Sequence, residues 1–211
     1  MHIDKGIVEL ERKIGAKSGF FEGLLSEDDW SFIIKLHSLF EAACTHLLMF
    51  HFAEPDLNEV LSRMELSNKS VGKLVLLRQL GLLSQDHRRL ISKLSELRNS
   101  LVHDIRQAEF TLSDYVEGLD KKAMRNFAES FSPYETTIRQ FQADPTLLKG
   151  IDPQLLKQAD IESVTERARE NPKRHIWLGA WSTLVSLVDM YSYSDYKQWT
   201  KAKTLLDDED S

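Results

Sequence analysis

The sequence predicts an all-α protein built as an up-and-down helical bundle. Apolar residues recur every three or four positions over most of the 211 residues, which is the spacing of an amphipathic helix. Alternation of apolar and polar residues, the pattern of a half-buried strand, is never sustained for long. Capping residues, glycines and prolines stand where the periodic stretches begin and end, so the helix limits can be predicted as well.

The most apolar stretch, residues 27–52, is expected to form the central helix of the bundle. Ser26 supplies its N-terminal cap, and apolar side chains are distributed over most of its circumference. Glu54-Pro55-Asp56 is expected to end this helix and to begin a short one. The short helix is predicted to end at about Met64. The next helix is predicted from Val71 to Leu80, with Ser67 or Ser70 as its N-terminal cap and Gly81 at its end.

A fourth helix is predicted from Ser84 to about Ile105, followed by short helices over 112–119 and 121–131. Three prolines indicate an irregular insertion at 133–170, with a turn of helix near Ile138. Asn171-Pro172 is a cap followed by proline at the first helical position, which favours a closing helix to about residue 200. The domains expected are an N-terminal appendage at 1–25, one helical domain at 26–200 with its principal motifs in 26–115, and a disordered acidic tail at 201–211.

Composition narrows the classes of function. The net charge is −6, so any nucleic-acid site must be a local basic patch. The single cysteine, Cys44, lies in an apolar stretch and can form no internal disulfide, which favours a reducing cytoplasm. No signal peptide precedes the first helix, and no window reaches the length of uncharged residues that a membrane helix needs, so we expect neither export nor a membrane span.

Charge is unevenly distributed along the first half of the chain. Residues 27–65 are acidic and residues 67–106 are basic. Two interpretations of this pattern are equally good. Either two helical arms attract each other, or one of them presents a face to a partner.

The predicted helix at 84–105 carries an anomalous arginine. Leu90, Leu94, Leu97 and Leu101 form a core-facing stripe, and Arg98 falls within the apolar arc that Ile91 and Val102 add to it. A buried guanidinium needs a carboxylate partner or a second interface. Glu41, the one acid of the central helix beyond its first turn, is the candidate partner, in a supporting rather than a catalytic role.

The opposite face of this helix gathers polar residues: Glu96, Asn99, Ser100 and His103. Asn99 and His103 are four positions apart, so they can touch on a helix. One interpretation is a solvated face with a histidine near the helix C-terminus, where the dipole favours the protonated ring. The other is a site for proton transfer. Spacing alone favours the first.

The run LRNSLVHD at 97–104 resembles the R-x4–6-H motif of the HEPN superfamily (higher eukaryotes and prokaryotes nucleotide-binding domains). In that motif a polar residue usually follows the arginine, as Asn99 does here. The stretch SVGKLVLLRQLGLL at 70–83, together with FTLSD at 110–114, also resembles the mannitol operon repressor family, which is considered HEPN-like. Both resemblances fall within residues 30–115. The tyrosine that some members carry two residues after the histidine is replaced by Ile105.

The resemblance implies an endoribonuclease that needs no metal or cofactor. In such a reaction the ribose 2′-hydroxyl attacks the adjacent phosphorus, one group removes its proton and another protonates the leaving 5′-oxygen. Histidine titrates near neutrality and arginine matches the phosphoryl oxygens, so His103 is assigned to proton transfer, Arg98 to phosphate and Asn99 to orientation. Flanking RNA phosphates would meet four basic residues, Arg88, Arg89, Lys93 and Arg106.

One motif supplies only one histidine, so the resemblance also implies a homodimer that brings two motifs together, with Ile91 and Val102 in the contact. A toxin, paired with an antitoxin, or a phage-defence component is the biological role that fits this activity. The alternative is a non-catalytic regulator of the mannitol operon repressor type that acts by contact with another protein. No helix-turn-helix with a basic recognition helix is visible, which disfavours direct binding to DNA. The remaining histidines and Trp177, Trp181 and Trp199 are interpreted as structural, and no metal-ligand spacing is present.

Overall fold

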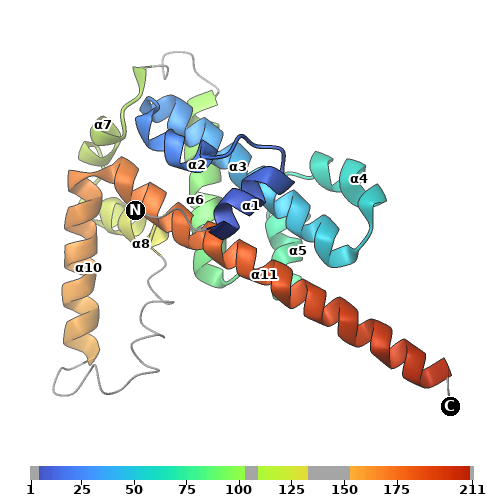
Figure 1. The fold of residues 1–211 in the computed structure, drawn as a ribbon. Coiled ribbons are helices and arrows are strands. Elements are labelled where there is room, and N and C mark those ends of the chain that lie inside the picture. Colours follow the sequence, from blue (N-terminus) through green and yellow to red (C-terminus); the bar gives the residue numbers. More distant parts are fainter. Residues whose placement is uncertain (1–4, 103–108, 133–152, 210–211) are drawn as a thin grey trace. The chain divides into compact units, whose positions relative to one another are not determined.

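The computed structural model describes residues 5–102, 109–132 and 153–209, and within them every regular element is a helix (Figure 1). This confirms the all-α class. The elements are α1 (Lys5–Lys13), α2 (Phe20–Gly23), η1 (Leu24–Ser26), α3 (Asp29–Phe52), η2 (Pro55–Leu57), α4 (Asn58–Arg63), α5 (Lys73–Gln79), α6 (Gln85–Val102), α7 (Leu112–Glu117), α8 (Lys121–Ser130), α10 (Pro153–Glu170) and α11 (Pro172–Glu209).

These helices form two compact units. Unit 1 comprises Met1–Glu22, Ser38–Leu83 and Leu184–Ser211, and unit 2 comprises Gly23–His37 and Ser84–Thr183. Both α3 and α11 contribute to each unit, so the central and closing helices of the sequence prediction are the two elements that the units share.

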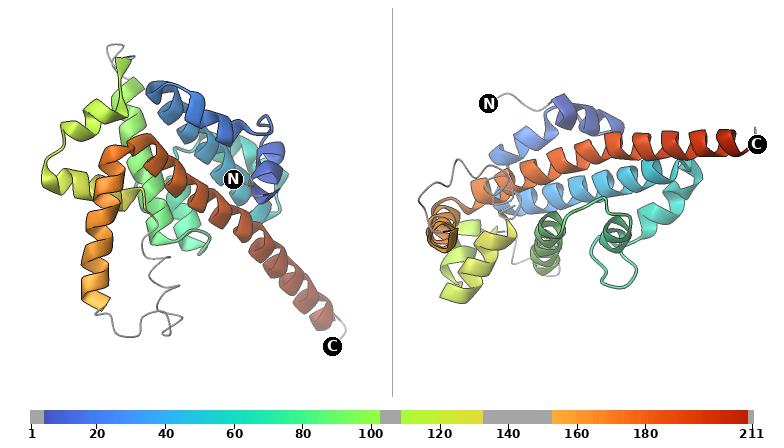
Figure 2. Two further views of the ribbon diagram at one scale, coloured as in Figure 1. Left: turned by 60° about the vertical axis from the view of Figure 1, so that its left-hand side comes forward. Right: turned by 90° about the horizontal axis from the view of Figure 1, so that it is seen from below.

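In unit 1, α3 and α11 run side by side (Figure 2). Two hydrogen bonds between side chains join them: His46 Nδ1 and the Tyr191 hydroxyl lie 2.8 Å apart, and His51 Nδ1 and the Ser194 hydroxyl 3.0 Å apart. These bonds give two of the histidines structural roles in which each ring shares a proton with a hydroxyl.

Helix α1 contributes buried side chains to unit 1. Ile7 and Leu10 are buried, and so is the carboxylate of Glu11. That carboxylate accepts hydrogen bonds from the backbone N–H groups of Gly19 and Phe21, at 2.8 and 2.9 Å, and so fixes the turn after α1. A buried carboxylate held by two backbone donors is stable without a cation.

Unit 2 is built around α6, which packs against α8, while α10 packs against α8 and α7. Gly179 of α11 approaches so closely that an added Cβ would collide with the carbonyl oxygen of Phe131 and come within 2.8 Å of Leu90 Cδ1. Only glycine allows this helix to lie so near the end of α8 and the first half of α6.

Two predicted segments differ in the structure. Residues 153–170 of the expected irregular insertion form the 18-residue helix α10, because Pro153 stands at its first position, where a proline has no hydrogen bond to lose. The acidic tail is helical to Glu209, since a helix already formed is extended at little cost. The turn expected near Ile138 lies outside the described residues.

The predicted helix cap at Ser67 or Ser70 is also wrong. Gly72 is the N-cap of α5 and no side chain caps it. Asn68 instead organises the preceding turn by accepting hydrogen bonds from the backbone N–H groups of Ser70 and Val71. An added Cβ on Gly72 would come within 2.5 Å of the Asn68 carbonyl oxygen, so this turn requires glycine.

By length and composition, α3 alone among the helices of the described residues could cross a membrane. The core helix of a soluble protein passes the same test, and 56% of the apolar window of α3 is buried inside the structure. Length and composition therefore do not by themselves assign α3 to a membrane.

Candidate functional site at the end of α6

The candidate site is carried by α6, whose core-facing stripe forms as predicted. Leu90, Leu94, Leu97 and Leu101 are all buried. The hydroxyl of Ser84 accepts from the backbone N–H of His87 at the start of the helix, as expected for a capping residue. This anchored stripe fixes the rotation of the helix and thereby sends Asn99 and Ser100 to the exposed side.

Arg98 lies half-buried near the end of α6. Its Nη1 donates to the amide oxygen of Asn99 at 3.1 Å. No carboxylate pairs with Arg98 within the described residues. The guanidinium is therefore oriented by a neutral group and keeps its full charge.

The other polar residues of this face have local partners. The hydroxyl of Ser100 donates to the carbonyl oxygen of Leu97 at 2.7 Å, and Glu96 accepts from Lys93 Nζ at 3.1 Å. His103, the predicted proton-transfer group, lies outside the described residues, as do Arg106 and Ile105.

Glu41 is paired with Lys73, not with Arg98. Its Oε1 lies 3.4 Å from Lys73 Nζ, and both residues belong to unit 1, whereas Arg98 belongs to unit 2. Because the partner of Glu41 is 32 positions away on a different helix, no local spacing could have predicted this pair.

The predicted RNA-binding residues that the structure describes, Arg88, Arg89 and Lys93, all have intramolecular interactions. Arg89 Nη2 donates to the carbonyl oxygen of Glu129 at 2.8 Å, close to the C-terminus of α8, and Lys93 pairs with Glu96. Arg88 is half-buried. Basic residues on α6 thus stabilise unit 2 whether or not they also meet phosphate.

Of the two residues predicted to form the dimer contact, only Val102 is exposed. Ile91 is fully buried in the protein's own core and cannot contribute to a surface, while Val102 is 37% exposed. Leu178 and Trp181 on α11 are exposed as well. Together with Leu25, these three are the exposed large apolar side chains among the described residues of unit 2.

One other reactive group, the thiol of Cys44, is excluded as a nucleophile. Burial raises the pKa of the Cys44 thiol to about 12, so this group stays protonated near neutral pH. Within the described ranges, no three His, Cys, Asp or Glu side chains are grouped to hold a metal ion.

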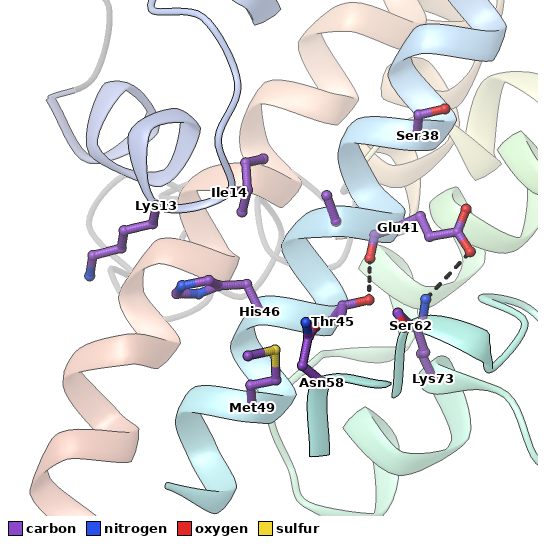
Figure 3. Close-up of a pocket in the computed structure, with 11 residues that line it drawn as sticks. Lys13, Ile14, Ser38, Glu41, Thr45, His46, Met49, Asn58, Ser62 and Lys73 are labelled. Atoms are coloured by element: carbon purple, nitrogen blue, oxygen red, sulfur yellow. Dashed lines mark hydrogen bonds and ion pairs between the residues drawn. The ribbon is translucent and has the colours of Figure 1, made fainter. Parts of the chain in front are cut away.

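The sequence analysis missed a cavity of about 470 Å³ in unit 1, formed by α1, α3, α4 and α5 (Figure 3). Glu41 and Lys73 lie on one side of it, and Lys13 and His46 on the other. The fully buried lysine is its most unusual feature, and the sequence shows it only as one base in a basic stretch.

Comparison with known proteins identifies no relative of this chain: no family model, no curated protein and no solved structure matches it.

Proposed function

We propose that this protein is a metal-independent endoribonuclease whose site lies at the C-terminal end of α6. The observation that carries the proposal is the state of Arg98. It is half-buried beside the core stripe, its guanidinium is held by the neutral amide of Asn99, and no described carboxylate neutralises it. A guanidinium that is held in place and has no counter-charge can stabilise the negative charge that develops on a phosphodiester in the transition state of cleavage.

In the proposed reaction Arg98 stabilises the negative charge that grows on the phosphoryl oxygens. His103, five residues further along the chain, transfers the proton of the attacking 2′-hydroxyl or of the leaving 5′-oxygen. Asn99 keeps the guanidinium in place. The products are a 2′,3′-cyclic phosphate and a free 5′-hydroxyl, so the reaction consumes no water, metal or cofactor.

A single copy of the motif provides one histidine for two proton transfers, and we therefore include a homodimer in the proposal. Val102 follows Arg98 by one helical turn and is exposed, so it is the residue of α6 best placed for an isologous contact. A toxin or phage-defence role in the cytoplasm fits this activity.

The test is cleavage of a fluorophore-labelled RNA oligonucleotide in the presence of EDTA, with the product end identified by mass spectrometry. His103→Ala is expected to lower kcat by about 10²–10⁴-fold, and Arg98→Ala by about 10²–10³-fold. Arg78→Ala, which removes an exposed arginine on α5, serves as the matched control and should cleave as the unaltered protein does.

Cleavage that survives both substitutions, or that stops on addition of EDTA, would exclude the proposed mechanism. Sedimentation of the unaltered protein and of Val102→Glu tests the dimer. The charged residue should dissociate the dimer and reduce cleavage together.

The second candidate is a non-catalytic regulator of the mannitol operon repressor type, which binds another protein. The exposure of Leu178 and Trp181 on one helix favours it, because exposed apolar groups at this spacing are typical of a contact surface. This second function would be supported if the purified protein cleaves no RNA and if Trp181→Ser, but not His103→Ala, loses the contact with the other protein.

A further inference from the structure

The cavity of unit 1 is separate from the proposed nuclease site and shares no residue with it. It is walled by the end of α1, one face of α3, and parts of α4 and α5. Its volume of about 470 Å³ lies within the range of small-molecule sites. Polar groups of α3, α4 and α5 line it, and the Lys13 side chain of α1 lies at its edge with the ammonium directed away from Glu41 and Lys73 (Figure 3). Several polar groups around one cavity are the arrangement of a site that orients a ligand.

Lys73 is buried completely at the side of this cavity, with 0% of its side chain exposed. The acceptor that the structure shows for its ammonium is Glu41 Oε1, at 3.4 Å. A charge-assisted hydrogen bond to a carboxylate is normally about 2.7–2.9 Å long. The pair is therefore loose, and the charge of the ammonium is matched only in part.

Glu41 itself is 40% exposed, so solvent screens the negative member of the pair while the positive member is sealed in the protein. This asymmetry leaves the charge of Lys73 only partly compensated. An anion that enters the cavity would complete the match.

Lys13 adds a second positive charge on the opposite side. Its Nζ lies 4.8 Å from the centroid of the Tyr191 ring and 5.6 Å from that of Phe50, so cation–π contacts hold an otherwise exposed ammonium in place. Because the Lys13 side chain is already ordered, less conformational entropy is lost when a ligand binds.

His46 lines the same side and adds no competing charge. Burial, together with the charge of Lys13, lowers the pKa of its imidazole, so the ring is neutral near pH 7. Where the Tyr191 hydroxyl donates to Nδ1, the ring carries its proton on Nε2 and has a second donor to offer.

Asn58 of α4 lies between these two sides, and Ser62 of α4 lies beside Lys73 (Figure 3). An amide and a hydroxyl can donate to a ligand oxygen or accept from a ligand hydroxyl. Two cations, one carboxylate and a neutral ring give the cavity a net charge of about +1.

We propose that this cavity binds a small polar ligand that carries an oxyanion, either a carboxylate or a phosphate, attracted by the charges of Lys13 at its edge and Lys73 behind its wall. Asn58 and Ser62 contact its other polar groups, and Glu41 accepts from a hydroxyl or ammonium of the ligand. Lys73 acts from behind the cavity wall through its charge.

The experiment is an NMR titration of the full chain in which the backbone amide signals of Thr45 and Met49, on the cavity wall, are followed. The probes are inorganic phosphate, acetate and glycerol, with sodium chloride at the same ionic strength as the reference. Phosphate and acetate should shift these two signals to saturation, and glycerol and chloride should not. The anion that binds with the higher affinity shows whether the oxyanion of the ligand is a phosphate or a carboxylate.

Lys13→Gln and Lys73→Met are each expected to weaken the anion about tenfold. Asn58→Asp, which places a negative charge in the cavity, should weaken it at least as much. Lys17→Gln removes an exposed lysine of the loop after α1 that does not line the cavity, and it should bind as the unaltered protein does.

Two results would overturn the proposal: no saturable shift at Thr45 and Met49 with either anion, or equal affinity in Lys13→Gln and Lys17→Gln. Lys13 is exposed, so its substitution keeps the test valid even if Lys73→Met fails to fold. Neither result bears on RNA cleavage, since no cavity residue belongs to α6.

Discussion

Lys73 and Arg98 are two cations of this protein with opposite surroundings. Lys73 is fully buried and is paired with the carboxylate of Glu41. Arg98 is half-buried and is hydrogen-bonded to the neutral amide of Asn99. A charge removed from water needs a counter-charge, whereas a charge that still reaches water does not. Lys73 is therefore sealed in the core and paired with its counter-charge, whereas the guanidinium of Arg98 still reaches water.

The largest effect on stability is expected from Lys73→Ala, which should lower the free energy of unfolding by about 3 kcal/mol. The substitution removes a buried aliphatic stem and leaves a void. Lys73→Met fills that void without a charge, and Glu41, being 40% exposed, is then solvated. We therefore expect Lys73→Met to lie within about 1 kcal/mol of the unaltered protein.

Urea unfolding followed by circular dichroism measures both values. If the methionine variant is as unstable as the alanine variant, the ion pair and not the stem stabilises this region, and the comparison with Arg98 must be revised.

A smaller effect is expected from pH, through a buried histidine at the other end of α6. His87 is 4% exposed, its Nδ1 shares a proton with the Ser84 hydroxyl, and its Nε2 has no hydrogen-bond partner in the part of the chain that the structure describes. Burial lowers its pKa below the value of 6.5 that it has in the unfolded chain. The unfolded state then binds more protons, so stability is complete above pH 6.5 and falls as the pH decreases below it.

His87→Leu should reduce this loss. The measurement is the urea midpoint between pH 5 and 8. His175, whose pKa burial also lowers, will leave part of the acid sensitivity in place. If the urea midpoint of the leucine variant depends on pH as steeply as that of the unaltered protein, protonation of His87 does not destabilise the folded state.

The smallest effect on stability is expected for Arg98→Ala, about 0.5 kcal/mol or less, because the arginine has no buried counter-charge to abandon. The same variant is expected to lose nearly all RNA cleavage. Thermal unfolding and the cleavage assay on one preparation separate the two quantities. A loss of stability above about 2 kcal/mol would make Arg98 a structural residue, and its proposed role with phosphate would lose its basis.

The sequence by itself determined the helices that depend on local signals. The end of α3, the limits of α7 and α8, and the buried leucine stripe of α6 follow from three-four spacing and from local signals. Asp120, for example, caps α8 by accepting from the Ala123 backbone N–H. The start of α3 does not, because Asp28, and not the expected Ser26, caps it by accepting from the Ser31 backbone N–H. The hydrogen bond between Arg98 and Asn99 was not predicted, since the sequence put these two residues on opposite faces of the helix.

Only the tertiary structure decided the partners of residues far apart in the chain. Glu41 pairs with Lys73 across 32 positions, and His46 with Tyr191 across 145. It also decided that the N-terminal residues enter a core and that α3 and α11 serve two units. The physical reason is that a helix forms from contacts within a few residues, whereas the choice of which charges and rings are buried together depends on how whole helices pack.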